Sequence, residues 1–170
     1  MNEIKLPNKD KYYSFFENNK LKEIDNLDFT LLKLKLMHPS EGEGWSVDFC
    51  NDVEFYYKRF LKLIYLYPTE KIVPSKAIDI FWHYHILDTK NYLTSTNHIF
   101  GAYLHHYPYY GMLGVEDETN LKNSYIRTLK LYKKTFKGGL PDTILSFENS
   151  KTGTCKGGGE STCAGRCFSK

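Results

Sequence analysis

The longest helical pattern in the chain runs from Ser46 to about Tyr67, and it constrains the fold more than any other feature. Its apolar residues recur at the three-, four- and seven-residue spacing of one buried helix face. They are Val53, Tyr56, Tyr57, Phe60, Leu61, Ile64 and Tyr67. Ser46 is a suitable N-cap, and Pro68 ends the pattern because proline has no backbone N–H to donate. The chain therefore contains a long amphipathic helix whose apolar face needs partners.

Shorter segments with a helical pattern lie on both sides of this helix. They cover approximately residues 11–19, 25–38, 76–93, 97–106 and 116–136. We find no alternating strand pattern, no heptad pattern and no internal repeat. The sequence therefore predicts an all-α fold, a single compact domain of about five to six helices over residues 1–140.

The composition changes after this predicted domain. Residues 150–170 are rich in Gly, Ser, Thr, Cys and Lys, and Phe168 is their one aromatic residue. Such a segment cannot bury enough apolar surface to offset the entropy that is lost when a chain becomes ordered. We therefore expect residues 141–170 to form a flexible, disordered Gly/Cys-rich tail.

The net charge of +3 is located in residues 151–170, which carry four basic residues and one acidic residue. The remainder is neutral, which disfavours a folded nucleic-acid-binding surface. No segment approaches the run of about 18 apolar residues that a membrane span needs, and the N-terminus lacks the apolar core of a secretory signal. We therefore expect a cytoplasmic protein without a membrane partner, in which the cysteines are reduced thiols.

The segment from Asp79 to Asp88 places two histidines and two acids inside a dense apolar run, Asp-Ile-Phe-Trp-His-Tyr-His-Ile-Leu-Asp. On a helix, Asp79 and His83 are one turn apart and share a narrow polar face. His85 lies about 160° round from His83, so a regular helix cannot direct both rings at one ion. We expect His85 to be a hydrogen-bonded core histidine, and any site to be built around His83 with Asp79.

A carboxylate one turn before a histidine can bind a metal ion together with it, or orient its ring. The preferred ligand set is Asp79, His83 and His38, with Zn or Cu as the ion. The second-choice ligands are His85, His98 and His105. Further candidates outside the motif are Glu41, Glu43 and His106.

Helical geometry limits these candidates in two ways. On one helix His98 and His105 would be separated by about 10.5 Å, which is too far for both to bind one ion without other ligands. Adjacent His105 and His106 would point about 100° apart, so at most one of them joins a given site.

Two alternatives to a metal site also remain. Asp79 and His83 can form an ordinary surface pair, or His83 can be the general base of a hydrolase-type enzyme. Of the two classes, the sequence favours a protein that is not an enzyme.

Three cysteines, Cys155, Cys163 and Cys167, lie in the tail. Their spacing lacks the paired C-x-x-C of common zinc modules, yet three thiolates can hold Zn or Cu(I). Alternatively, the tail is an interaction segment or the substrate of a Cys-modifying enzyme, with the body as a recognition domain, or its cysteines are idle. No phosphate-binding loop, G-x-S-x-G elbow or H-E-x-x-H pair is present.

The block from Leu36 to Met112 resembles the glycine-rich domain-containing-protein-like family. The matching pieces are Met37-His38-Pro39, the residues from Tyr56 to Phe60, Val73-Pro74-Ser75 and, most specifically, Trp82-His83-x-His85. The larger eukaryotic members look like multi-part proteins with a glycine-rich region, whereas this chain has only a short Gly/Cys tail. The resemblance implies no catalytic residues for this chain.

Overall fold

The computed structural model describes residues 19–147, and all regular structure in this range is helical. Residues 19–25 are helical and are followed by α2 (Thr30–Met37), α3 (Val47–Leu66), α4 (Lys76–Leu87), α5 (Thr89–Phe100), α6 (Val115–Phe136) and α7 (Asp142–Leu145). The predicted all-α class is therefore confirmed. The predicted helix at 11–19 lies outside the described residues except for residue 19. The three tail cysteines all lie outside them.

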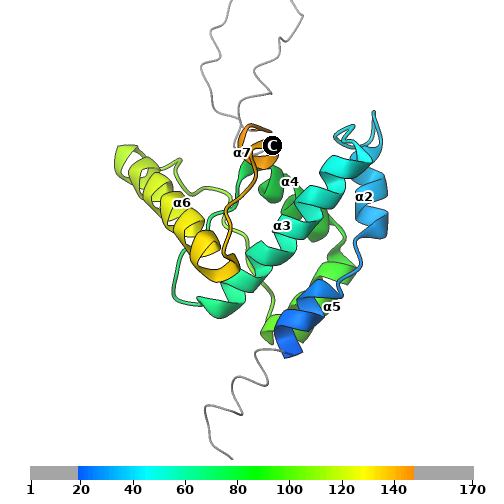
Figure 1. Ribbon diagram of the computed structural model, residues 1–170, viewed down its shortest axis with the longest axis horizontal. Helices are drawn as coiled ribbons and strands as arrows, with labels where there is room; N and C mark the ends of the chain where they lie inside the picture. The colour runs from blue at the N-terminus through cyan, green and yellow to red at the C-terminus, as the bar shows by residue number, and fades with distance from the viewer. Residues whose placement is uncertain (1–18, 148–170) are drawn as a thin grey trace, which may run out of the picture.

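Helix α3 is the central element and packs against α2, α4 and α6 (Figure 1). It begins as predicted, because the hydroxyl of Ser46 accepts a hydrogen bond from the Phe49 N–H at 3.2 Å. Its C-cap is Tyr67, directly before Pro68. The apolar face of α3 is buried, with Tyr57 and Phe60 inaccessible to solvent. Helix α2 begins later than predicted, at Thr30, whose N–H donates to the Asp28 carboxylate at 2.9 Å.

The predicted helix at 76–93 is divided in two. Helix α4 ends at Leu87, and the carboxylate of Asp88 accepts a hydrogen bond from the Asn91 N–H at 3.4 Å, which begins α5. Helix α5 then ends at Gly101, which adopts a left-handed conformation with φ of 72°. The predicted helix at 97–106 is therefore wrong, because only residues 97–100 are helical.

Residues 101–114 form an irregular connection, here called the 101–114 segment, that returns the chain to α6. The carboxylate of Asp117, in the first turn of α6, accepts hydrogen bonds from the N–H of Gly111 at 2.6 Å and of Leu113 at 3.2 Å. Gly111 has φ of 89°, a conformation that glycine adopts without strain. These contacts hold the far end of the 101–114 segment against α6.

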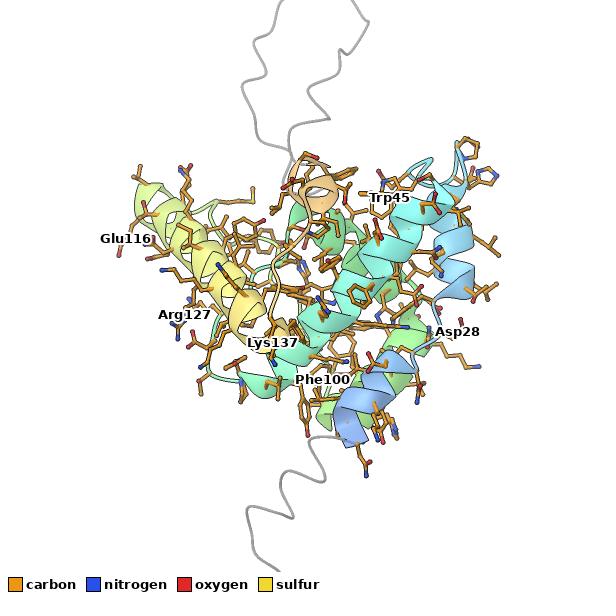
Figure 2. The ribbon with its side chains drawn as sticks, viewed as in Figure 1. Asp28, Trp45, Phe100, Glu116, Arg127 and Lys137 are labelled. Atoms are coloured by element: carbon orange, nitrogen blue, oxygen red, sulfur yellow. The ribbon has the colours of Figure 1, made fainter. Side chains whose placement is uncertain are left out.

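The body of the protein continues beyond the expected boundary at residue 140. Helix α7 follows that position, and Ile144 within it is fully buried. The ring of Phe147 lies 5.2 Å from Phe49 and 5.5 Å from Trp45. Residues 141–147 therefore belong to the packed body. Side chains fill the space between α3 and α6 (Figure 2).

None of the helices in the described range is both long enough and apolar enough to cross a membrane.

Candidate metal site

Asp79, His83 and His106 bring three potential ligand atoms to within 4.8 Å of one another. Helix α4 supplies Asp79 in its first turn and His83 one turn later, and the 101–114 segment supplies His106. The Nε2–H of His106 donates to Oδ1 of Asp79 at 2.9 Å, and Nδ1 of His83 lies 3.6 Å from Oδ2 of the same carboxylate. Each oxygen of the Asp79 carboxylate therefore faces one of the two imidazoles.

The three side chains differ in their exposure to solvent. The exposed fraction is 13% for His106, 24% for Asp79 and 40% for His83. The ring of His106 lies between two other rings, with its centroid 4.4 Å from Trp82 and 4.6 Å from His83. One side of the cluster is thus packed against protein, and the His83 side is open to solvent.

A short chain of buried hydrogen bonds fixes the position of His106. The Nε1–H of Trp82 donates to the hydroxyl of Tyr92 at 2.9 Å, and that hydroxyl donates to the carbonyl of Leu104. Burial raises the pKa of Tyr92 to about 12, so the hydroxyl keeps its proton. Leu104 is two residues before His106, so α4 and α5 together anchor the part of the 101–114 segment that carries His106.

Two imidazole nitrogens and one carboxylate oxygen form a donor set that zinc favours. Ligand atoms bound to a tetrahedral zinc ion at about 2.0–2.1 Å are about 3.3 Å apart. The two imidazole nitrogens lie 2.9 and 3.6 Å from different oxygens of Asp79, and one ligand atom from each of the three residues lies within 4.8 Å of the others, so side-chain movements would be needed to bring the three donors to one ion. The same geometry also satisfies the hydrogen bonding of His106 without a metal, as a polar cluster.

His85 lies elsewhere and is not part of this cluster. It is 1% exposed, its Nδ1 is 2.8 Å from the Tyr57 hydroxyl, and its Nε2 is 3.3 Å from the Ser95 hydroxyl. Because the Ser95 hydroxyl donates to the Tyr92 carbonyl at 3.1 Å, its oxygen accepts from the Nε2–H of His85. Nδ1 of His85 then accepts from Tyr57. Burial lowers the pKa of His85 to about 4, only partly opposed by the charge of Asp88, so the ring is neutral.

The remaining histidines named from the sequence lie outside the cluster. Nδ1 of His38 accepts a hydrogen bond from the Glu41 N–H at 3.0 Å in the loop after α2. His98 pairs with Glu23 at 3.3 Å on the surface, and exposed His105 has its ring 5.0 Å from that of Tyr103.

The structure thus brings Asp79 and His83 together, as expected, but the third member of the group is His106 and not His38. From the sequence His106 is only a further candidate, on a helix expected to run from about residue 97 to residue 106. Gly101 was the available signal that this helix ends early.

A hollow on the described surface lies apart from the cluster. It has a volume of about 480 Å³ and lies between α6 and residues 69–71, with Tyr110 at one wall. Arg127 and Glu70, which line it, form an ion pair at 2.7 Å. The hollow contains no residue of the histidine–carboxylate cluster, and its paired charges indicate no particular ligand.

The fold and site define a small helical domain with a histidine–carboxylate cluster between α4 and the 101–114 segment. The chain belongs to the UCP032817-like family, whose family model matches residues 20–133 and so includes Asp79, His83 and His106. The resemblance to the glycine-rich domain-containing-protein-like family is therefore wrong, because the family match is to a different family. No curated protein and no solved structure shows significant similarity to the chain.

Proposed function

We propose that this protein binds one divalent transition-metal ion, with zinc as the best fit, through Asp79, His83 and His106. The observation that carries the proposal is the convergence of His106, from a separate irregular segment, on a carboxylate that already faces His83. Two side chains one turn apart on a helix, such as Asp79 and His83, often face each other simply because of their spacing. His106 is 23 residues after His83, so its position beside this pair depends on the tertiary fold.

The chemistry of the donors favours zinc over Cu(I). Imidazole and carboxylate are borderline and hard ligands that suit Zn²⁺, whereas Cu(I) prefers thiolates and thioethers. With three protein ligands, a tetrahedral ion keeps one position for water or another ligand. His83, at 40% exposure, leaves that side accessible from solvent.

The proposal decides between two roles for His83. A ring nitrogen that coordinates a metal uses its lone pair for the ion, so His83 is a ligand and not a general base. In this arrangement the proton on Nε2 of His106 also has to leave if that nitrogen binds the ion, and metal binding then releases protons. We retain the cytoplasmic location expected from the sequence as part of the proposal.

Equilibrium dialysis against zinc tests the proposal. The protein should carry Cys155→Ser, Cys163→Ser and Cys167→Ser, so that tail thiols cannot contribute zinc ligands of their own. In this background we expect one zinc ion per chain, and Asp79→Asn and His83→Gln should each abolish stoichiometric binding. His38→Gln and His98→Gln are matched controls that remove an imidazole outside the cluster, and they should bind as the background does.

The opposite results would remove the proposal. If the background protein takes up no zinc, cobalt or copper, Asp79, His83 and His106 form a hydrogen-bonded polar cluster and nothing more. If zinc binds but the Asp79 and His83 variants bind it equally well, the ion lies elsewhere.

A further inference from the structure

We propose that the C-terminal half of α6, together with two neighbouring side chains of α3, binds a single-stranded nucleic acid. This surface contains none of the candidate metal ligands and is independent of the proposed metal binding. It consists of five cations and one aromatic ring and is called the α6 basic face: Arg59, Lys130, Lys133, Lys134, Lys137 and Phe55.

The charges of α6 are separated along its length. Its first turn carries three acidic residues, whereas residues 119–141 contain six basic residues and no acidic one. Two of the six are paired, since Lys122 contacts Glu118 at 2.8 Å and Arg127 contacts Glu70 at 2.7 Å. The other four are exposed and form no ion pair within the described range; they are Lys130, Lys133, Lys134 and Lys137. The neutral charge total of the sequence before residue 151 does not reveal this separation, because a total ignores where the charges lie.

These four lysines lie on one side of α6. Their spacings of three, four and seven residues keep them within an arc of about 100° and along about 10.5 Å of the helix axis. The helix dipole favours cations in the last turn, where Lys133 and Lys134 lie, but its effect falls off before Lys130. At about 3.4 Å per phosphate along one strand, the lysines span about three phosphates.

Arg59 extends the α6 basic face onto α3, which packs against α6 (Figure 1). Its guanidinium lies 4.8 Å from the ring of Phe136, which is three residues after Lys133 and therefore beside it on α6. It also lies 4.3 Å from the ring of Phe55 and 5.5 Å from that of Tyr56, and it pairs with no carboxylate of residues 19–147. Stacking on rings holds the planar group and leaves its N–H donors for phosphate oxygens.

The exposed ring of Phe55 favours a nucleic acid over other polyanions. Its side chain is 51% exposed beside Arg59, so a base can stack on the ring while phosphates contact the cations. In a duplex the bases already stack on one another, so the ring favours a single strand. A membrane-bound helix inserts its apolar face into the lipid, but Leu131 and Tyr132 of α6 are buried in the protein core.

Fluorescence anisotropy of a labelled single-stranded oligothymidylate, titrated with the full chain, tests this binding. For a single strand, each neutralised phosphate contributes about −0.7 to the slope of log affinity against log salt concentration. Five cations therefore predict a slope of about −3.5, which is a loss of affinity of about 100-fold between about 50 and 200 mM salt. Changing all four lysines of the α6 basic face to Gln should make the slope shallower by about 2.8.

The matched control removes the same net charge from exposed lysines elsewhere and should keep nearly the full slope; it changes Lys22, Lys35, Lys71 and Lys90 to Gln. Phe55→Ala should lower the affinity by about 5–150-fold, the value of one stacked base, without changing the slope. Tyr109→Ala, which removes a ring that is 56% exposed outside this face, should bind as the unchanged protein does. All the substituted side chains are exposed, so the fold should be retained.

The contrary results overturn the inference in different ways. If both four-lysine variants lose the same affinity, net charge or the cations of residues 151–170 account for the binding. If Phe55→Ala binds normally, or if poly-glutamate binds as tightly as the oligonucleotide, the surface recognises negative charge and not a nucleic acid. Tighter binding to vesicles of anionic phospholipid identifies a membrane as the partner instead. Absence of oligonucleotide binding at about 50 mM salt also removes the inference, because nonspecific electrostatic contacts are strongest at low salt.

Discussion

The neutral, buried state of His85 predicts a specific loss of stability in acid. His85 is 1% exposed, its two ring nitrogens are occupied by Tyr57 and Ser95, and burial lowers its pKa from 6.5 to about 4. A shift of this size corresponds to about 3 kcal/mol of stability, at about 1.4 kcal/mol per pKa unit. The perturbation is a change in pH from 7.5 to 4.5.

The sign follows from the number of protons bound in each state. In the unfolded chain the imidazole binds a proton below about pH 6.5, whereas in the folded protein it does so only below about pH 4. Between these values the unfolded state binds more protons, so the free energy of unfolding falls as the pH falls. The contribution of His85 is fully present above pH 6.5 and is lost by about pH 4.

Urea denaturation of metal-free protein, at several pH values between 7.5 and 4.5, measures this effect. The control is His85→Gln, which keeps a polar side chain but cannot titrate. The wild-type protein should lose about 2–3 kcal/mol more than the variant over this range. The difference isolates His85, because all the other titrating groups are the same in both proteins. Parallel pH dependences for the two proteins would refute the reasoning and show that His85 is not held neutral.

Three further changes test the packing around the site. Tyr57→Phe removes the hydroxyl that donates to buried His85 and should lower the free energy of unfolding by about 1–3 kcal/mol in urea denaturation. Gly111→Ala should cost at least about 1 kcal/mol and weaken zinc binding in dialysis, because φ is 89° and the new Cβ would lie 2.5 Å from Leu121 Cδ2. Ser46→Ala should lower the thermal midpoint through loss of the α3 N-cap, worth about 1 kcal/mol.

Each of these variants has a matched control. Tyr109→Phe removes a hydroxyl from a side chain that is 56% exposed and should leave stability unchanged, so an equal loss would contradict the account of Tyr57. Gly101→Ala also strains a left-handed residue, but nothing lies within 4 Å of its Cβ, and it should cost less than Gly111→Ala. Ser40→Ala, in an exposed loop, is the control for Ser46→Ala. If both are equally destabilising, loss of the α3 N-cap is not the cause of the lower stability.

The helical class and the central helix could be predicted because they depend on local information. The spacing of Tyr57 and Phe60 defines the buried face of α3, and Ser46 and Pro68 lie at its ends. The same geometry separated His83 from His85, and in the structure His83 is 40% exposed whereas His85 is 1% exposed. A regular helix fixes directions over one or two turns, so these relations follow from spacing.

The third member of the cluster could not be predicted because its position depends on how an irregular segment returns to α4. Helical periodicity continues past residue 87, but the carboxylate of Asp88 begins a new helix and Gly101 ends it. The position of His106 then depends on the hydrogen bonds from Trp82 through Tyr92 to Leu104, which join residues distant in sequence. The sequence favours His38 only as a loop residue outside the motif, and His38 lies in a separate loop.

The comparison of His106→Gln with His105→Gln tests the metal site most directly. The two residues are neighbours and of the same type, but only His106 contacts Asp79 and His83, whereas His105 is exposed. In zinc dialysis of the protein without tail cysteines, His105→Gln should still bind one ion per chain. Removal of a group that only orients a ligand lowers metal affinity by about 10–100-fold. His106→Gln should lower the zinc affinity by more than this. Equal zinc affinity in the two variants would contradict the proposal that His106 is a ligand of the metal ion.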